Sequence, residues 1–80
     1  MMLSQFKGLD EMEQIEAIWN KGIHLAYRND EEYKYELIQI DKFYVELKHH
    51  KLHDVLKGFD TFTVLPDQYK GKISIATSGE

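Results

Sequence analysis

The sequence predicts an α+β fold in which one N-terminal helix packs on a four-stranded antiparallel β-meander. Up to Trp19, apolar residues recur every three or four positions, which is the period of an amphipathic helix. After Gly22 they alternate with polar residues, which is the period of a half-buried strand. Short polar breaks separate the later apolar runs, as in hairpins. At 80 residues the chain is expected to form one domain, with a helix over 9–21, a meander over 22–64 and a C-terminal turn and tail over 65–80.

The helix carries a single apolar stripe, which is expected to face the sheet and to bury Trp19. The stripe consists of Leu9, Met12, Ile15, Ile18 and Trp19. Asp10 and Glu13 form a capping-box pattern at its beginning, and Gly22 follows it as a stop signal. The start of the helix lies between Ser4 and Asp10.

The first three strands follow from alternation and from turn residues. Ile23, Leu25 and Tyr27 alternate with polar or small residues and predict the first strand. The second and third strands are predicted at Tyr33–Ile40 and Phe43–His50. Because only two residues separate them, Ile40 is expected opposite Phe43 and Ile38 opposite Val45. A slip of one residue is the alternative, since Asp41-Lys42 is not the preferred Asp-Gly loop.

The segment after His50 fits two structures. Leu52, Val55, Leu56 and Phe59 have helical spacing, whereas Gly58 and the run 61–64 favour extended chain. We interpret it as a turn at 51–54 followed by a fourth strand from about residue 55 to residue 64. A short edge strand is predicted at 73–75 and a frayed end at 77–80.

Three runs of sequence resemble a group of small uncharacterised bacterial proteins in which a helix precedes an antiparallel meander. The runs are residues 17–22 (AIWNKG), 35–47 (YELIQIDKFYVEL) and 59–62 (FDTF). The resemblance covers about residues 9–75 and is one of pattern. It implies a strand after His50 and no activity, cofactor or site residue.

Composition excludes several functional classes. A net charge of −4 argues against broad nucleic-acid binding, which needs a clustered basic surface. No apolar run approaches the roughly 20 residues of a membrane span. The absence of cysteine excludes disulfides, Cys-ligated zinc and thiol nucleophiles. The first residues lack the pattern of a secretory signal, so we expect a cytoplasmic location and no membrane partner.

The residue patterns indicate neither a cofactor nor a metal site, and no constellation argues for an enzyme. His49, His50 and His53 lie close in sequence, but only the His49–His53 pair could converge, and zinc needs three or four ligands. Glu36 is expected on the apolar face and Glu46 on the opposite face, each in a surface ion pair with Lys34 or Lys48. Nucleophile motifs and glycine-rich phosphate loops are absent.

The strongest functional indication is a tyrosine-rich sheet face. One helix covers one face of a sheet, so the other face is expected to be open. That open face would carry Tyr33, Tyr35, Leu37 and Tyr44, with His24 and Arg28 around them. Tyrosine with a polar rim is typical of protein interfaces. We therefore expect a non-enzymatic interaction module that forms a homodimer through this face. The alternatives are a protein or peptide partner, or a small ligand, on the same face.

Overall fold

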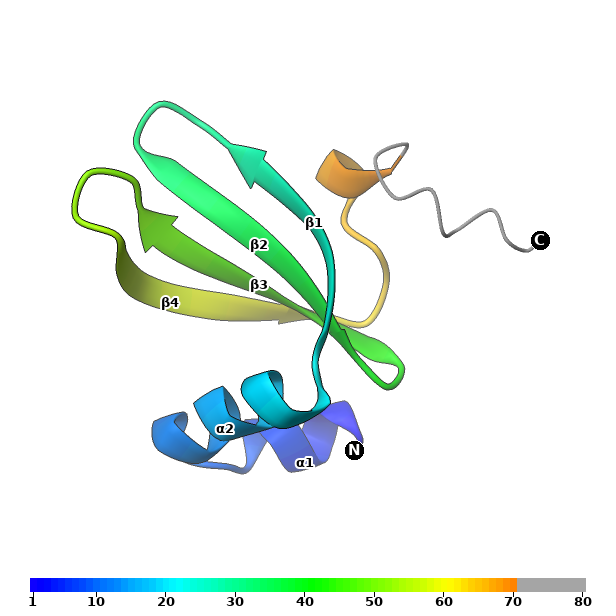
Figure 1. The fold of residues 1–80 in the computed structure, drawn as a ribbon. Helices are drawn as coiled ribbons and strands as arrows, with labels where there is room; N and C mark the ends of the chain where they lie inside the picture. The colour runs from blue at the N-terminus through cyan, green and yellow to red at the C-terminus, as the bar shows by residue number, and fades with distance from the viewer. Residues whose placement is uncertain (71–80) are drawn as a thin grey trace.

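The computed structural model describes residues 1–70 and has the α+β fold that the sequence predicts (Figure 1). Its elements, in chain order, are α1 (Leu3–Lys7), α2 (Glu11–Lys21), β1 (Ile23–Asn29), β2 (Tyr33–Ile40), β3 (Phe43–His50), β4 (Val55–Phe62) and the 3-10 turn η1 (Asp67–Tyr69). The four strands form one antiparallel sheet in the order β1-β2-β3-β4. The predicted edge strand at 73–75 and the predicted frayed end lie outside the described residues. In residues 1–70 no helix is both long and apolar enough to cross a membrane.

The N-terminal segment forms two helices rather than one. Asp10 is the N-cap of α2, where its Oδ1 accepts the Glu13 backbone N–H at 2.8 Å and its own N–H donates to Glu13 Oε1 at 3.0 Å. This reciprocal pair confirms the predicted capping box. The preceding turn, α1, is a separate element that buries Phe6.

The central hairpin has the predicted register. Ile40 pairs with Phe43 and Ile38 with Val45, so the alternative slip of one residue does not occur. Asp41 supports the two-residue loop by adopting a positive φ of 51°. The turn at 51–54 and a strand that begins at residue 55 are also as predicted, with Asp54 at a φ of 52° immediately before β4. This strand ends at Phe62 rather than at about residue 64.

The main core lies between the helices and one end of the sheet (Figure 1). Its buried members are Phe6, Ala17, Ile18, Ile38, Ile40, Phe43 and Val45. The Phe6 ring lies 5.4 Å from the Phe43 ring and 6.1 Å from the Phe59 ring, measured between centroids. The β-strands run on past this core, so the helices cover only part of the face on which they pack (Figure 1).

The prediction that Trp19 packs against the sheet is wrong. Trp19 is 80% exposed and Met12 is 72% exposed, whereas Ala17 and Ile18 are buried. The physical reason is α1, which supplies Phe6 to the core and holds α2 through a hydrogen bond from Gln14 Nε2 to the Phe6 carbonyl, 3.0 Å long. Only part of the apolar stripe of α2 therefore faces the sheet.

The beginning of β1 also departs from the prediction, which placed His24 on the tyrosine-rich face. The pairing of β1 with β2 shifts by one residue between His24, which pairs with Ile38, and Ala26, which pairs with Leu37. This bulge turns Leu25 toward Leu37 on the face opposite the helices and leaves Ile23 64% exposed. His24 lies on the helix side, not on the tyrosine-rich face.

Candidate functional site

The tyrosine-rich face is covered at its centre by the chain itself. Leu37 and Tyr69 are both fully buried and pack against each other, with Leu65, Leu25 and Tyr44 around them. The segment of residues 65–69, called here the C-terminal segment, thus forms a second layer on this face. The prediction that Leu37 lies at the centre of an exposed surface is wrong, because the open face was inferred without that segment.

A charged network holds the C-terminal segment in place. Tyr69 Oη donates to Glu46 Oε2 at 2.5 Å, and Arg28 Nε donates to the same oxygen at 2.9 Å. Glu46 is only 8% exposed, so both donors matter for a carboxylate that has lost most of its water. Burial, together with the hydrogen bond to Glu46, raises the pKa of Tyr69 above its ordinary value. Glu46 therefore pairs with Arg28, not with the lysines expected from the sequence.

The outer part of the tyrosine-rich face is a ladder of aromatic rings and cations. The Arg28 guanidinium lies 3.8 Å from the Tyr35 ring centroid, and the Lys48 ammonium lies 4.1 Å from that of Tyr33. Tyr35 Oη donates to Asp30 Oδ2 at 2.9 Å, which raises the pKa of Tyr35. The structure brings together five of the six predicted interface residues on this face: Tyr33, Tyr35 and Arg28 in the ladder, and Tyr44 beside the buried Leu37. His24 lies on the other face. The Tyr35 hydroxyl and the Arg28 guanidinium are already engaged within the chain, with Asp30 and Glu46 respectively.

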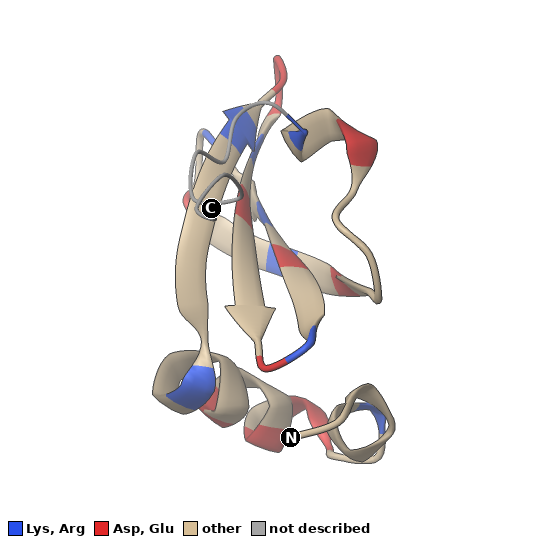
Figure 2. Cartoon of the chain, turned by 90° about the vertical axis from the view of Figure 1, so that its right-hand side faces the viewer, with Lys and Arg blue, Asp and Glu red and all other residues tan. Residues whose placement is uncertain are grey.

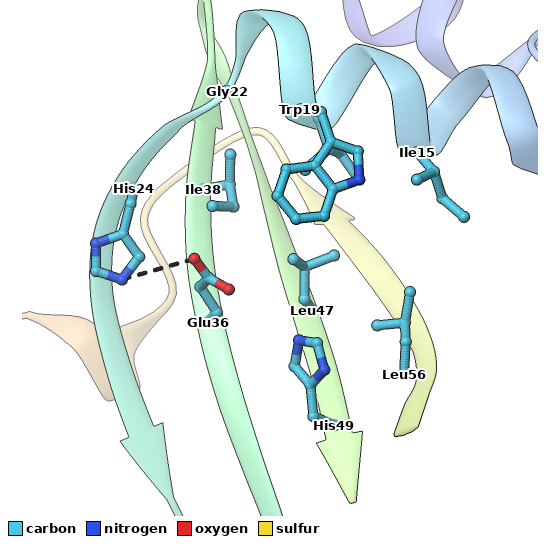
Figure 3. A pocket seen from close by; sticks show the side chains of 10 residues that line it. Ile15, Trp19, Gly22, His24, Glu36, Ile38, Leu47, His49 and Leu56 are labelled. Atoms are coloured by element: carbon cyan, nitrogen blue, oxygen red, sulfur yellow. Dashed lines mark ion pairs between the residues drawn. The ribbon is translucent and has the colours of Figure 1, made fainter. Parts of the chain in front are cut away.

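A different surface, which the sequence reading missed, lies on the helix side of the sheet. It is a groove with a volume of about 240 Å³ between α2 and the part of the sheet that the helices leave uncovered (Figure 3). Its lining residues come from α2, the α2–β1 junction and all four strands: Ile15, Ile18, Trp19, Gly22, His24, Glu36, Ile38, Leu47, His49 and Leu56. We call it the α2 groove. Most of its lining is apolar.

Trp19 stands at the rim of the α2 groove, over Leu47 (Figure 3). At 80% exposure it is the largest apolar side chain that the described residues leave in solvent. Ile15 and Leu56 flank it on the side of β4 (Figure 3). The sequence contained a signal for this surface, namely the wide apolar stripe of Met12, Ile15, Ile18 and Trp19. Because Phe6 fills part of the core, the contact between α2 and the sheet does not need the whole stripe.

The polar side chains of the α2 groove lie toward its open end. His24 Nε2 and Glu36 Oε2 are 3.8 Å apart across β1 and β2, and His49 projects from β3 (Figure 3). Glu36 therefore has a histidine partner in place of the lysine expected from the sequence. Groups of this kind can orient a partner by hydrogen bonds at the edge of an apolar contact.

The three neighbouring histidines do not converge. His49 lines the α2 groove, whereas the His50 ring stacks at 5.0 Å on His53 and its Nε2 lies 3.6 Å from Glu32. Within residues 1–70, no group of three or more His, Cys, Asp or Glu side chains could hold a metal ion.

Charge is distributed over the described chain rather than gathered at one place (Figure 2). Lys and Arg occur on helix, strand and turn, and the acidic residues are interspersed with them (Figure 2). Within α2 the charges are ordered, with Glu11 and Glu13 in the first turn and Lys21 in the last.

No family model matches this chain, and comparisons with curated proteins and with solved structures give no significant match.

Proposed function

We propose that this chain is a small non-enzymatic interaction module that binds a protein partner in the α2 groove. The observation that carries the proposal is Trp19, 80% exposed at the rim of an apolar groove. Covering most of a tryptophan surface is worth roughly 3–5 kcal/mol before the entropy cost of association. Exposed apolar surface that is continuous with a groove and edged by polar groups is typical of a protein interaction site.

The shape of the α2 groove favours an amphipathic helix as the bound element. The groove crosses the strands from His24 on β1 to Leu56 on β4, so it runs along α2 rather than along the strands (Figure 3). An eight-residue strand such as β3 is about 26 Å long, whereas a packed helix is about 10 Å wide. One helix lying across the strands therefore covers less than half of their length. A second helix placed 8–10 Å from α2 would lie at the usual separation of packed helices.

A small apolar ligand is the second candidate for the same site. It is favoured by the hollow itself and by the His24–Glu36 pair, which could hold a polar head group. The volume of about 240 Å³ lies below the roughly 300–1,000 Å³ of most small-molecule sites. This comparison favours the protein partner.

The probe 1-anilinonaphthalene-8-sulfonate tests whether the α2 groove accepts an apolar partner. We expect its fluorescence to rise with the folded wild type at low micromolar protein, and to stay low with Trp19→Glu. Leu52→Glu is the matched control, because Leu52 is also 80% exposed but lies in the β3–β4 turn.

Val55→Glu and Leu56→Glu make a second matched pair. These neighbours lie on opposite faces of β4, and only Leu56 lines the groove. Loss of the signal with Leu56→Glu and its retention with Val55→Glu is the expected result. Equal signals from wild type, Trp19→Glu and Leu56→Glu would contradict the proposed site.

A further inference from the structure

We infer that the partner is a second copy of this chain, whose α2 lies antiparallel to the first α2 in the α2 groove and places its own Trp19 there. The inference rests on the proposed function of the groove and names its occupant. It differs from the dimer expected from the sequence, which used the tyrosine-rich face now occupied by the C-terminal segment.

The helix that fits the groove is present on the chain. Ala17 and Ile18 of α2 face the core, while Met12, Ile15 and Trp19 recur at spacings of three and four on its outer side. Anchors at i, i+3 and i+7 are the pattern by which an amphipathic helix binds a hydrophobic groove. The outer stripe of α2 therefore has the chemistry that the groove accepts.

Stripe and groove are also placed as a two-fold contact requires. In a two-fold contact each copy uses the same surface, so the inserted stripe and the groove that receives it must lie next to each other on one copy. Ile15 and Trp19 belong to both, since they form part of the stripe and line the groove. Ile15 lies between Met12 and Trp19, so an antiparallel pair with its two-fold axis near Ile15 would bring each Trp19 to the end of the other copy's groove that is lined by Ile15 and Leu56.

The charges of α2 favour the antiparallel arrangement. Glu11 and Glu13 lie in the first turn and Lys21 in the last. Antiparallel helices bring the acidic end of one copy to the basic end of the other, and they align the helix dipoles favourably. A parallel arrangement would place like charges together.

Residues 1–70 of the same copy do not fill the groove. No residue of α1 lines it, and the C-terminal segment packs on Leu37, on the opposite face of the sheet. The described chain reaches Lys70 beside η1, away from the helices (Figure 1). Within residues 1–70, no segment of the same copy covers Trp19.

Sedimentation velocity across a concentration series tests self-association. We expect wild type to dimerise, and Trp19→Glu to raise the dissociation constant roughly 30-fold or more, as loss of a hot-spot aromatic does. Leu52→Glu should dimerise like wild type, and circular dichroism checks that each variant is folded. A monomeric wild type at high micromolar concentration, or a dimer that Trp19→Glu does not weaken, overturns the inference.

A charge reversal tests the orientation. Glu11→Lys and Lys21→Glu should each weaken the dimer, and the double variant should restore it, because the two positions meet across an antiparallel pair. Additive weakening in the double variant contradicts the antiparallel arrangement.

Cysteine crosslinking tests the position of the axis, since the chain contains no cysteine. Ile15→Cys should form a disulfide-linked dimer on mild oxidation, while Asn20→Cys, an exposed position on the same helix, should not. Equal crosslinking of the two variants contradicts the arrangement. If the groove binds the fluorescent probe but wild type stays monomeric, the self-association inference fails while the proposed function stands; if neither occurs, both fail.

Discussion

Tyr69 donates a 2.5 Å hydrogen bond to Glu46 and thereby fixes the C-terminal segment over Leu37. The two residues are 23 positions apart, so this long-range contact covers the centre of one face of the sheet. The other face retains an open apolar groove beside α2.

The Tyr69–Glu46 contact predicts graded losses of stability. Tyr69→Ala should lower the free energy of unfolding by roughly 3–5 kcal/mol, the usual cost of truncating a buried aromatic side chain. Tyr69→Phe keeps the ring over Leu37 and removes one donor to a buried carboxylate, so a loss of about 1–3 kcal/mol is expected. Urea unfolding of the three proteins measures both values. Equal stability of Tyr69→Ala and wild type would show that the C-terminal segment does not cover Leu37.

The same residue predicts loss of stability at alkaline pH. Burial and the hydrogen bond to Glu46 raise the pKa of Tyr69 above its ordinary value of 10.0. The protonated phenol is thus favoured in the folded state, and its contribution is fully present below pH 10 and is lost as pH rises through the folded-state pKa. Chemical unfolding at a series of alkaline pH values should give a shallower decline for Tyr69→Phe than for wild type. Parallel curves for the two proteins would contradict this role.

Leu37→Lys should unfold the chain. Leu37 is fully buried beneath Tyr69, and a lysine there would place a charge in an apolar cluster without a partner. Leu52→Lys, at a position that is 80% exposed, should leave the fold intact. Circular dichroism and thermal melting distinguish the two variants. A folded and equally stable Leu37→Lys would restore the open tyrosine-rich face expected from the sequence.

Gly22 predicts a steric effect at the junction of α2 and β1. A Cβ atom there would lie 2.4 Å from the Ile18 carbonyl oxygen and 2.4 Å from Ile38 Cγ2. Gly22→Ala should therefore destabilise the protein by about 1–3 kcal/mol through overpacking. At Gly8 the nearest atoms to a Cβ are 3.5 Å away, so Gly8→Ala is a control expected to have little effect on the melting temperature. Similar losses for both variants would argue against the close approach at Gly22.

The parts of the fold that were predictable depend on short-range signals. The α2 cap needs only Asp10 and Glu13, and the register of Ile40 and Phe43 follows from a two-residue loop. The errors arise from contacts between distant segments. The packing of Phe6 against Phe43 exposes Trp19, and the docking of Tyr69 on Glu46 buries Leu37.

The candidate site was missed for the same reason. The sequence shows that Trp19 and Ile15 belong to an apolar stripe, but it does not show which part of the stripe meets the sheet. The bulge between His24 and Ala26 is a second cause of the error, because the alternation of apolar and polar residues cannot reveal a shift of one residue in strand pairing. As a result His24 was expected on the tyrosine-rich face, whereas it lies across from Glu36 at the groove.

The most direct test of the α2 groove as an interaction surface is the accessibility of Trp19, the single tryptophan of the chain, measured by acrylamide quenching as the protein concentration rises. At low concentration Trp19 should quench as a solvent-exposed indole, in accord with its 80% exposure. At high concentration quenching should fall and the emission should shift to shorter wavelength, because the Trp19 ring enters the groove of a second copy. The Ile15→Cys covalent dimer should show the protected signal at every concentration. A Trp19 that stays fully quenchable throughout, in wild type and in the covalent dimer alike, would contradict the account.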